Sequence, residues 1–171
     1  GTYFYTVGDD GALQTVGMLF SPGYPGFLRG LAPEPGGAFV VATSGGQIAR
    51  YRSADGETDY LADGFDQLYG VAIGPGADIV FAELGTGRVH ALRSGTTEVL
   101  ASGLADPVGV VFADGRPLVA ESGGGRVVAV GGATETVVDG LVRPQGLAVA
   151  DGVLYIVDAG AKEVVAVDLN S

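Results

Sequence analysis

The sequence predicts an all-β fold, a β-propeller of four-stranded antiparallel blades, and three observations lead to it. Four segments that open with glycine and two small or aliphatic residues recur at spacings of 40, 39 and 37 residues. Short valine-rich runs alternate with glycine turns, and no stretch has a useful helical period. Glycine supplies 31 of the 171 residues, yet 47% of the residues are hydrophobic, which is enough for a buried core.

The length of the repeat distinguishes a propeller blade from a coil of a β-helix and from an independent domain. Each repeat is too long for one coil of a β-helix and too short to fold alone. A four-stranded sheet of this size cannot bury both faces by itself, so neighbouring sheets must stack face to face. The glycine at the start of each repeat suits the crowded inner end of a radial blade. These features together are typical of a β-propeller.

The elements of each repeat follow one order. The first strands begin at the recurring glycines, Gly30, Gly70, Gly109 and Gly146. A polar or glycine turn leads to second strands, expected at 39–43, 79–83, 118–121 and 154–158. A second glycine turn leads to third strands, expected at 48–51, 89–92, 127–130 and 164–167. Fourth strands complete every unit except the last, at 58–62, 97–101 and 135–138.

The two ends of the chain hold incomplete blades. Segments 2–7 and 12–16 align best with a third and a fourth strand. We expect one propeller domain or fragment, divided into a partial blade at 1–29, blades at 30–68, 69–107 and 108–144, and a partial blade at 145–171. The strand total is one too many for a closed ring of four blades and too few for six. This favours a fragment of a larger propeller, which would self-associate through exposed faces and edges. A ring closed by pairing the N-terminal strands with the last blade is the alternative.

The charge balance narrows the range of partners. The net charge of −11 repels phosphate backbones, so nucleic acid and anionic membranes are poor partners, whereas small cations or a basic protein surface are suitable ones. No apolar stretch has the length of a membrane span. The absence of cysteine excludes disulfides and zinc–thiolate sites and leaves the compartment open. The excess of arginine over lysine hints at a bacterial source.

Several motifs resemble the blades of NHL-repeat propellers. Segments 104–111 and 141–148 read LADPVGVV and LVRPQGLA, segments 119–123 and 156–160 read VAESG and IVDAG, and GRV occurs at 87–89 and 125–127. The likeness extends to the gluconolactonase/strictosidine-synthase-like six-bladed propellers. It implies the propeller fold and leaves the activity open, because these propellers host many functions.

The residue before each first-strand glycine should face the central channel. These residues are Arg29, Tyr69, Val108 and Gln145. In gluconolactonase-like enzymes, comparable positions supply asparagine and acidic ligands to a divalent metal, and none of the four is such a residue. Arg29, Tyr69 and Gln145 instead indicate recognition of a polar or anionic ligand by hydrogen bonds. A plugged or water-filled channel is the alternative.

The second strands end in polar residues, namely Thr43, Glu83, Glu121 and Asp158. The three acids are candidate ligands for a divalent cation such as calcium. Their recurrence favours a different role, in which each carboxylate accepts backbone N–H bonds from the glycine turn beside it. The sequence requires no cofactor.

Two further features are candidate sites. His90, the single histidine, lies in mid-strand and is expected to be a half-buried structural residue. Segment 18–28 breaks the repeat with extra aromatic residues and is either a binding loop on one rim or a cap on the core. No Ser-His-Asp arrangement is readable, and the glycine runs connect strand to strand rather than strand to helix.

The sequence therefore predicts that the protein is a binding or interaction scaffold for a protein or a small ligand. A gluconolactonase-like metal-dependent hydrolase, or a related lyase, with its site partly outside this chain is the alternative. A purely structural propeller segment is the third interpretation.

Overall fold

The computed structural model describes residues 2–19 and 26–171, and it is built almost entirely of antiparallel strands. A hairpin of β1 (Thr2–Val7) and β2 (Leu13–Leu19) comes first. The first full sheet contains β3 (Leu28–Pro33), β4 (Ala38–Thr43), β5 (Ile48–Arg52) and β6 (Thr58–Ala62). The second contains β7 (Leu68–Ile73), β8 (Ile79–Glu83), β9 (Arg88–Arg93) and β10 (Thr96–Ala101), with a short 3₁₀ turn at Pro75–Ala77.

The second half of the chain repeats the same sheet. The third full sheet contains β11 (Pro107–Ala113), β12 (Arg116–Glu121), β13 (Arg126–Ala129) and β14 (Glu135–Val138). The last sheet has three strands, β15 (Pro144–Ala150), β16 (Val153–Asp158) and β17 (Glu163–Asp168). The strands follow the predicted succession, but every first strand begins two residues before its recurring glycine, at Leu28, Leu68, Pro107 and Pro144. In addition, β13 lies one residue earlier than expected and β2 extends to Leu19.

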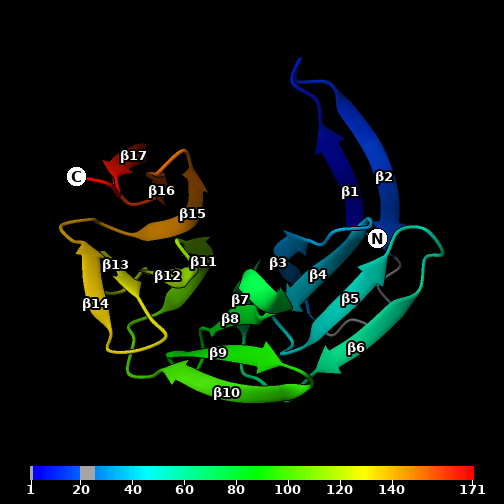
Figure 1. The fold of residues 1–171 in the computed structure, drawn as a ribbon, viewed down its shortest axis with the longest axis horizontal. Helices are drawn as coiled ribbons and strands as arrows, with labels where there is room; N and C mark the ends of the chain where they lie inside the picture. Colours follow the sequence, from blue (N-terminus) through cyan, green and yellow to red (C-terminus); the bar gives the residue numbers. More distant parts are fainter. Residues whose placement is uncertain (1, 20–25) are drawn as a thin grey trace.

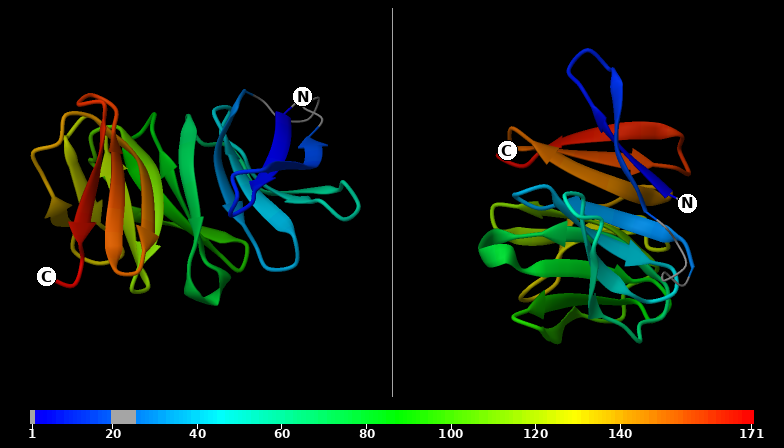
Figure 2. Two further views of the ribbon diagram at one scale, coloured as in Figure 1. Left: turned by 90° about the horizontal axis from the view of Figure 1, so that it is seen from above. Right: turned by 90° about the vertical axis from the view of Figure 1, so that its right-hand side faces the viewer.

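The sheets stand side by side as the blades of a propeller that forms an open arc (Figure 1). The innermost strands contact one another in the order β3, β7, β11 and β15. The hairpin lies at one end of the arc and the three-stranded sheet at the other, as a second view also shows (Figure 2). In the described residues β1 and β2 pair with each other and not with β15–β17, so the alternative of a ring closed by that pairing is wrong.

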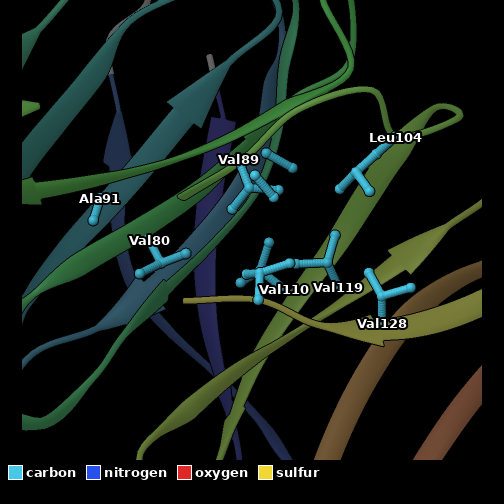
Figure 3. Packing of buried hydrophobic residues seen from close by; sticks show 10 residues of the cluster. Val80, Val89, Ala91, Leu104, Val110, Val119 and Val128 are labelled. Atoms are coloured by element: carbon cyan, nitrogen blue, oxygen red, sulfur yellow. The ribbon is translucent and has the colours of Figure 1, made fainter. Parts of the chain in front are cut away.

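The blades are held together by small aliphatic side chains between their faces. Between the second and third blades, Val80 and Val89 pack against Val110, Val119 and Val128, all buried (Figure 3). Full burial of one such valine stabilises the fold by about 1.5–3 kcal/mol. Because β-branched residues suit a pleated surface, the valine-rich runs give both the strands and the interfaces.

The inner ends of the blades pack too closely for a side chain. A Cβ placed on Gly30 would overlap the carbonyl oxygen of Tyr69, the residue before the next inner glycine. Gly70 has the same relation to the carbonyl oxygen of Val108, and Gly109 to that of Gln145. The recurring glycine is therefore required by the approach of the next blade's backbone.

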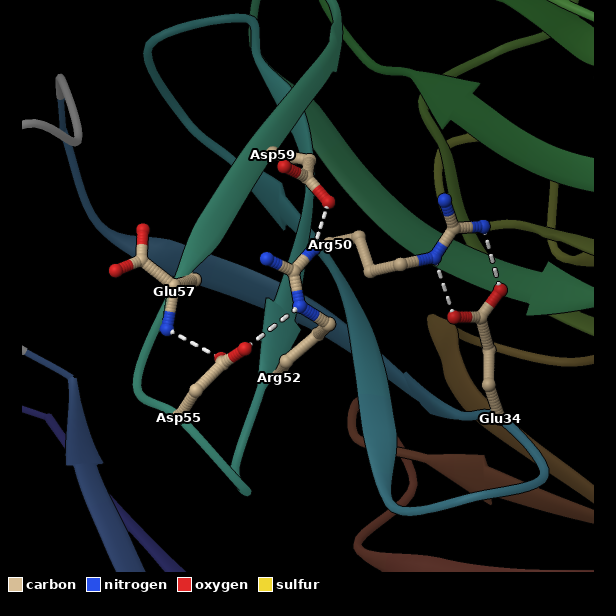
Figure 4. A network of polar contacts seen from close by, with 6 residues as sticks. All are labelled: Glu34, Arg50, Arg52, Asp55, Glu57 and Asp59. Carbon is tan, nitrogen blue, oxygen red and sulfur yellow. Dashed lines mark hydrogen bonds and ion pairs between the residues drawn. The ribbon is translucent and has the colours of Figure 1, made fainter.

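Charged residues support the outer part of the first blade (Figure 4). Arg50 on β5 binds Glu34 through two hydrogen bonds of 2.6 and 2.8 Å, and the hydrogen bond to Glu34 raises the pKa of Arg50. Arg52 bridges Asp55 in the following turn and Asp59 on β6. These exposed or half-buried pairs add little stability each. They join β5 to the turn between β3 and β4, and to β6.

Candidate functional site

Every inner strand carries an irregularity at the residues predicted to face the channel. The pairing of the first strand with the second shifts between Leu28 and Gly30, and the same shift recurs in each of the other three blades. The residues at these shifts include Arg29, Tyr69, Val108 and Gln145. A β-bulge leaves a residue outside the ladder and redirects its side chain, and bulges often lie next to binding sites.

Three of the four channel residues come together. Arg29, Tyr69 and Gln145 line one pocket of about 310 Å³, whose other walls are the glycine-containing inner strands β3, β7, β11 and β15. Tyr69 and Gln145 also line a neighbouring, more open pocket of about 500 Å³, with Asp106 and Ser122 at its edge. The fourth residue, Val108, is buried and adds only apolar surface to that second pocket.

The Arg29 guanidinium is held by aromatic rings rather than by an acid. Its central carbon lies 5.4 Å from the ring centroid of Tyr69 and 5.8 Å from that of Phe27. Such cation–π contacts contribute about 0.5–1 kcal/mol at exposed sites. Among the described residues, Arg29 forms no ion pair, whereas Arg50, Arg93 and Arg126 each bind a carboxylate. The Arg29 charge is therefore oriented and not neutralised.

The acids at the ends of the second strands are buried and engaged by the backbone. Asp158 accepts hydrogen bonds from the backbone N–H groups of Val142 and Arg143, each at 2.8 Å, and a longer one from Ala161. These amides lie mainly in the segment that enters the first strand of the same blade. The carboxylate therefore ties the entry of each blade to its second strand.

Glu121, Glu83 and Thr43 occupy the same position in the other blades. Glu121 accepts from the Ala105 amide at 3.0 Å and from Arg126 at 2.8 Å. Glu83 accepts from the Asp66 amide at 2.8 Å, and Thr43 accepts from the Gln47 amide at 3.1 Å. The favoured interpretation took the backbone donors from the glycine turn beside each acid. The structure corrects it, because most of the backbone N–H donors to the three acids come from the entry segments, whereas the longer bond from Ala161 comes from a turn.

The hydrogen bonds also control the charge of two of these acids. The Val142 and Arg143 amides lower the pKa of Asp158 below its ordinary value. Burial acts to raise the pKa of Glu83, but the hydrogen bonds from the Thr86 hydroxyl, the Asp66 amide and His90 outweigh it, so this pKa is lowered. Both carboxyl groups are charged at neutral pH.

The three acids are engaged separately, each in its own blade. Both carboxylate oxygens of Asp158 already accept N–H bonds, and Glu83 and Glu121 have separate partners in separate blades. Within residues 2–19 and 26–171, no three or more histidine, aspartate or glutamate side chains gather as a cation site. Cation binding by Glu83, Glu121 and Asp158 stays a prediction from the sequence.

His90 is more buried than the sequence indicated. Its Nε2 lies 2.9 Å from Oε1 of Glu83, and its ring packs against Phe65 and Phe81 at centroid distances of 4.9 and 5.3 Å. The pair joins the end of β8 to the middle of β9. Sequence reasoning missed this pair, although His90 lies opposite Phe81, two residues before Glu83, in the β8–β9 hairpin. A cross-strand comparison could have found it.

The proposed rim loop at 18–28 lies largely outside the described residues, since 20–25 are not described. Its end is visible: Phe27 is exposed and lies beside Arg29, close to the pocket. In the part of the chain that the structure describes, no helix has the length and apolar character needed to cross a bilayer.

Comparison with known proteins shows the fold and not the activity. No protein-family model matches the chain, and no curated protein does. A chain of the nidogen–laminin complex superposes with a TM-score of 0.81 at 19% identity, covering 95% of this chain and 65% of that one. A virginiamycin B lyase from Staphylococcus aureus gives 0.72 at 14% identity, covering 98% and 63%.

A gluconolactonase from Xanthomonas campestris gives a TM-score of 0.73 at 21% identity, covering 82% of this chain and 58% of that one. The chain thus spans less than two thirds of the length of each of these three structures. The neighbours include a chain from a protein–protein complex as well as enzymes. Together with the blade architecture, they show that the chain has the β-propeller fold of these proteins.

Proposed function

We propose that this chain is a binding module that recognises a small polar or anionic ligand at the inner ends of its blades, through Arg29, Tyr69 and Gln145. The observation that carries this proposal is the Arg29 guanidinium. It lines a pocket with the other two side chains and has aromatic neighbours but, in the described residues, no carboxylate partner.

The three side chains offer complementary hydrogen-bonding chemistry. A guanidinium presents N–H donors in a planar fork that matches a carboxylate or phosphate. A tyrosine hydroxyl and a glutamine amide both donate and accept, so they can bind the polar part of the same molecule. Since the remaining walls are glycine-containing backbone, the pocket has room for a ligand to approach the main chain.

The charge of the whole protein limits the size of that ligand. A net charge of −11 repels a polyanion approaching from solution. A single anionic group held against Arg29 is tolerated, because close hydrogen bonding acts at short range and the long-range repulsion is screened by salt. We therefore expect a small molecule with one acidic group and additional hydroxyl or amide groups.

A thermal-shift screen tests this proposal. The probes are inorganic phosphate, succinate and a set of hydroxylated monocarboxylates, each added to the wild-type chain, to Arg29→Ala and to Arg88→Ala. Arg88 is the matched control, because it is also exposed but lies outside the pocket. We expect at least one probe to raise the Tm of the wild type and of Arg88→Ala, and not that of Arg29→Ala. Equal shifts for all three proteins, or no shift with any probe, would overturn the proposal.

A metal-dependent hydrolase is the second candidate, favoured by the superposition on a gluconolactonase at a TM-score of 0.73. Its metal site would lie partly outside this chain. Hydrolysis of a lactone that requires calcium, together with a calcium-dependent rise in Tm, would favour this candidate over the binding module.

We also propose that the chain binds protein surfaces, and copies of itself, through the two ends of the arc. The neighbour from a protein–protein complex supports protein binding by this fold in general. The sheet faces at the ends of the arc support self-association, because apolar side chains are exposed there.

A further inference from the structure

We infer that the outer face of the last sheet, β15–β17, docks the N-terminal blade of a second copy of this chain, head to tail, in a contact that repeats the packing between blades. This inference deepens the self-association proposed above and rests on it. We call this outer face, formed by Gly146, Tyr155, Val157 and Val164, the tail face.

The tail face is apolar and uncovered. The matching positions of the first three blades are covered by the next blade and are at most 4% exposed, for example Val80, Val89 and Ala120. In the last sheet, Tyr155 is 41% exposed, Val157 46% and Val164 65%. The tail face therefore carries the apolar side chains of a blade interface, although no described part of this chain packs against it. Burial of such a surface is favourable in water.

Gly146 shows what kind of surface would cover it. The three earlier inner glycines are needed because the carbonyl oxygen of the next blade occupies the place of a side chain. Gly146 has no such neighbour, since a Cβ there would meet only Val157 of its own sheet, at an ordinary distance of 3.5 Å. Nothing within the described chain explains this glycine. A backbone carbonyl arriving from an inner strand of another blade would explain it.

The N-terminal blade of a second copy carries that inner strand. Arg29 directly precedes Gly30, just as Tyr69, Val108 and Gln145 directly precede the other inner glycines. Its carbonyl is therefore the counterpart of the three that dock. The neighbouring Leu31 is 50% exposed, while its counterparts Val71 and Val110 are buried.

The N-terminal hairpin leaves this inner strand accessible. Phe4 stacks on Phe39 and Tyr51, so β1 and β2 cover the second and third strands of the first blade. Beside β3 they leave a pocket of about 260 Å³ lined by Tyr3, Tyr5 and Leu31. We call this end, formed by β3 and the pocket, the head face. β1 and β2 lie where the third and fourth strands of a preceding blade would lie. They must therefore move outward before β17 of another copy can dock there.

A contact between two different faces propagates. Each copy has one head and one tail face, so head-to-tail docking is heterologous and yields dimers and longer species unless a ring closes. The mass measured by light scattering should therefore rise with concentration above the 17.1 kDa of one chain.

Two single variants on the tail face, each with a matched control, test the surface. Val164→Lys places a charge on the tail face and should weaken association at least tenfold, while Val99→Lys, a matched change on the exposed outer strand β10, should leave it unchanged. Gly146→Ala should also weaken association with little change in Tm. Gly109→Ala, at the covered counterpart, should lower Tm, because there the carbonyl of Gln145 is already in place.

Mixing two blocked variants tests the head-to-tail arrangement. Leu31→Lys blocks the head and Val164→Lys blocks the tail, so each alone should be monomeric, and an equal mixture should form a dimer with one intact contact. A monomeric wild type at all concentrations, or a mixture that stays monomeric, would overturn the inference. Val164 lies outside the Arg29 pocket, so Val164→Lys should still bind the anion found for the wild type. Failure of association and failure of ligand binding are thus distinguished.

Discussion

Two sets of residues lie at equivalent positions in the blades of this propeller, and they differ in what they do. The residues that end the second strands are nearly uniform in type, and each is buried and bonded to backbone amides of its own blade. The residues at the bulges of the inner strands differ in every blade, being Arg29, Tyr69, Val108 and Gln145, and three of them line one pocket. A uniform residue in a repeat solves a structural problem common to all blades. A residue that varies is free to serve a single site.

The largest effect should follow from removing a uniform acid. Glu121→Ala leaves the Ala105 amide without its acceptor and removes the partner of Arg126. Because hydrogen bonds to a buried charge are lost, we expect the free energy of unfolding, measured by urea denaturation, to fall by about 3 kcal/mol. Glu135→Ala, an exposed acid paired with Arg116 in the same blade, should cost less than about 1 kcal/mol. Equal losses would contradict the structural role of the uniform set.

A variable residue should show the opposite pattern. Arg29→Ala should leave stability within about 0.5 kcal/mol, because the side chain is exposed. It should weaken binding of the anionic ligand by roughly tenfold or more, since one charge-assisted hydrogen-bonding group is lost. Titration calorimetry with the best probe of the screen measures this, with Arg88→Ala as the control.

Lowering the pH should destabilise the fold through two of the uniform acids, Asp158 and Glu83. Their pKa values are lower in the folded chain than ordinary carboxyl values near 4, so the unfolded chain binds more protons as the pH falls. Their contribution to stability is complete above the unfolded pKa and is lost as the pH falls through the lowered folded values. We expect Tm to be flat from pH 7 to about 5 and to fall below about pH 4. Asp158→Asn should make this fall shallower, and a wild-type Tm that rises on acidification would contradict the account.

The smallest effect should come from salt. Raising the salt concentration from about 0.05 to 0.5 M screens both the Arg29–anion attraction and the long-range repulsion from the net charge of −11, so the ligand affinity should change by no more than a few-fold. Relative to the wild type, the Gln145→Glu variant should gain affinity or lose less of it, because salt then also screens the repulsion between the new carboxylate and the ligand. Calorimetry at the two salt concentrations compares the two proteins.

The sequence predicted the parts of the fold that repeat. The spacing of Gly30, Gly70 and Gly109, and the valine runs after them, are sufficient to place the blades, because local propensity and interface packing require the same residues. The alternative prediction, that the N-terminal strands pair with the last blade, is wrong. No local pattern in the sequence determines which distant strand edges meet.

The site was predicted less completely, for a similar reason. The register of the repeat predicted equivalent inner positions for Arg29, Tyr69 and Gln145, and the three side chains line one pocket. The absence of an acid beside Arg29 in the described residues depends on which blades are neighbours, which a sequence does not contain. Burial of Val108 and the Glu83–His90 pair depend on cross-strand contacts that the repeat alignment does not contain.

The central claim is that the uniform and variable residues carry separate roles, and one paired measurement tests it. The ligand Kd and the free energy of unfolding are determined for Arg29→Ala and Glu121→Ala at a temperature where both proteins are folded. The account predicts that Arg29→Ala loses affinity and keeps its stability, whereas Glu121→Ala loses stability and keeps its affinity. Loss of stability in both variants, with the affinity of Arg29→Ala unchanged, would contradict it.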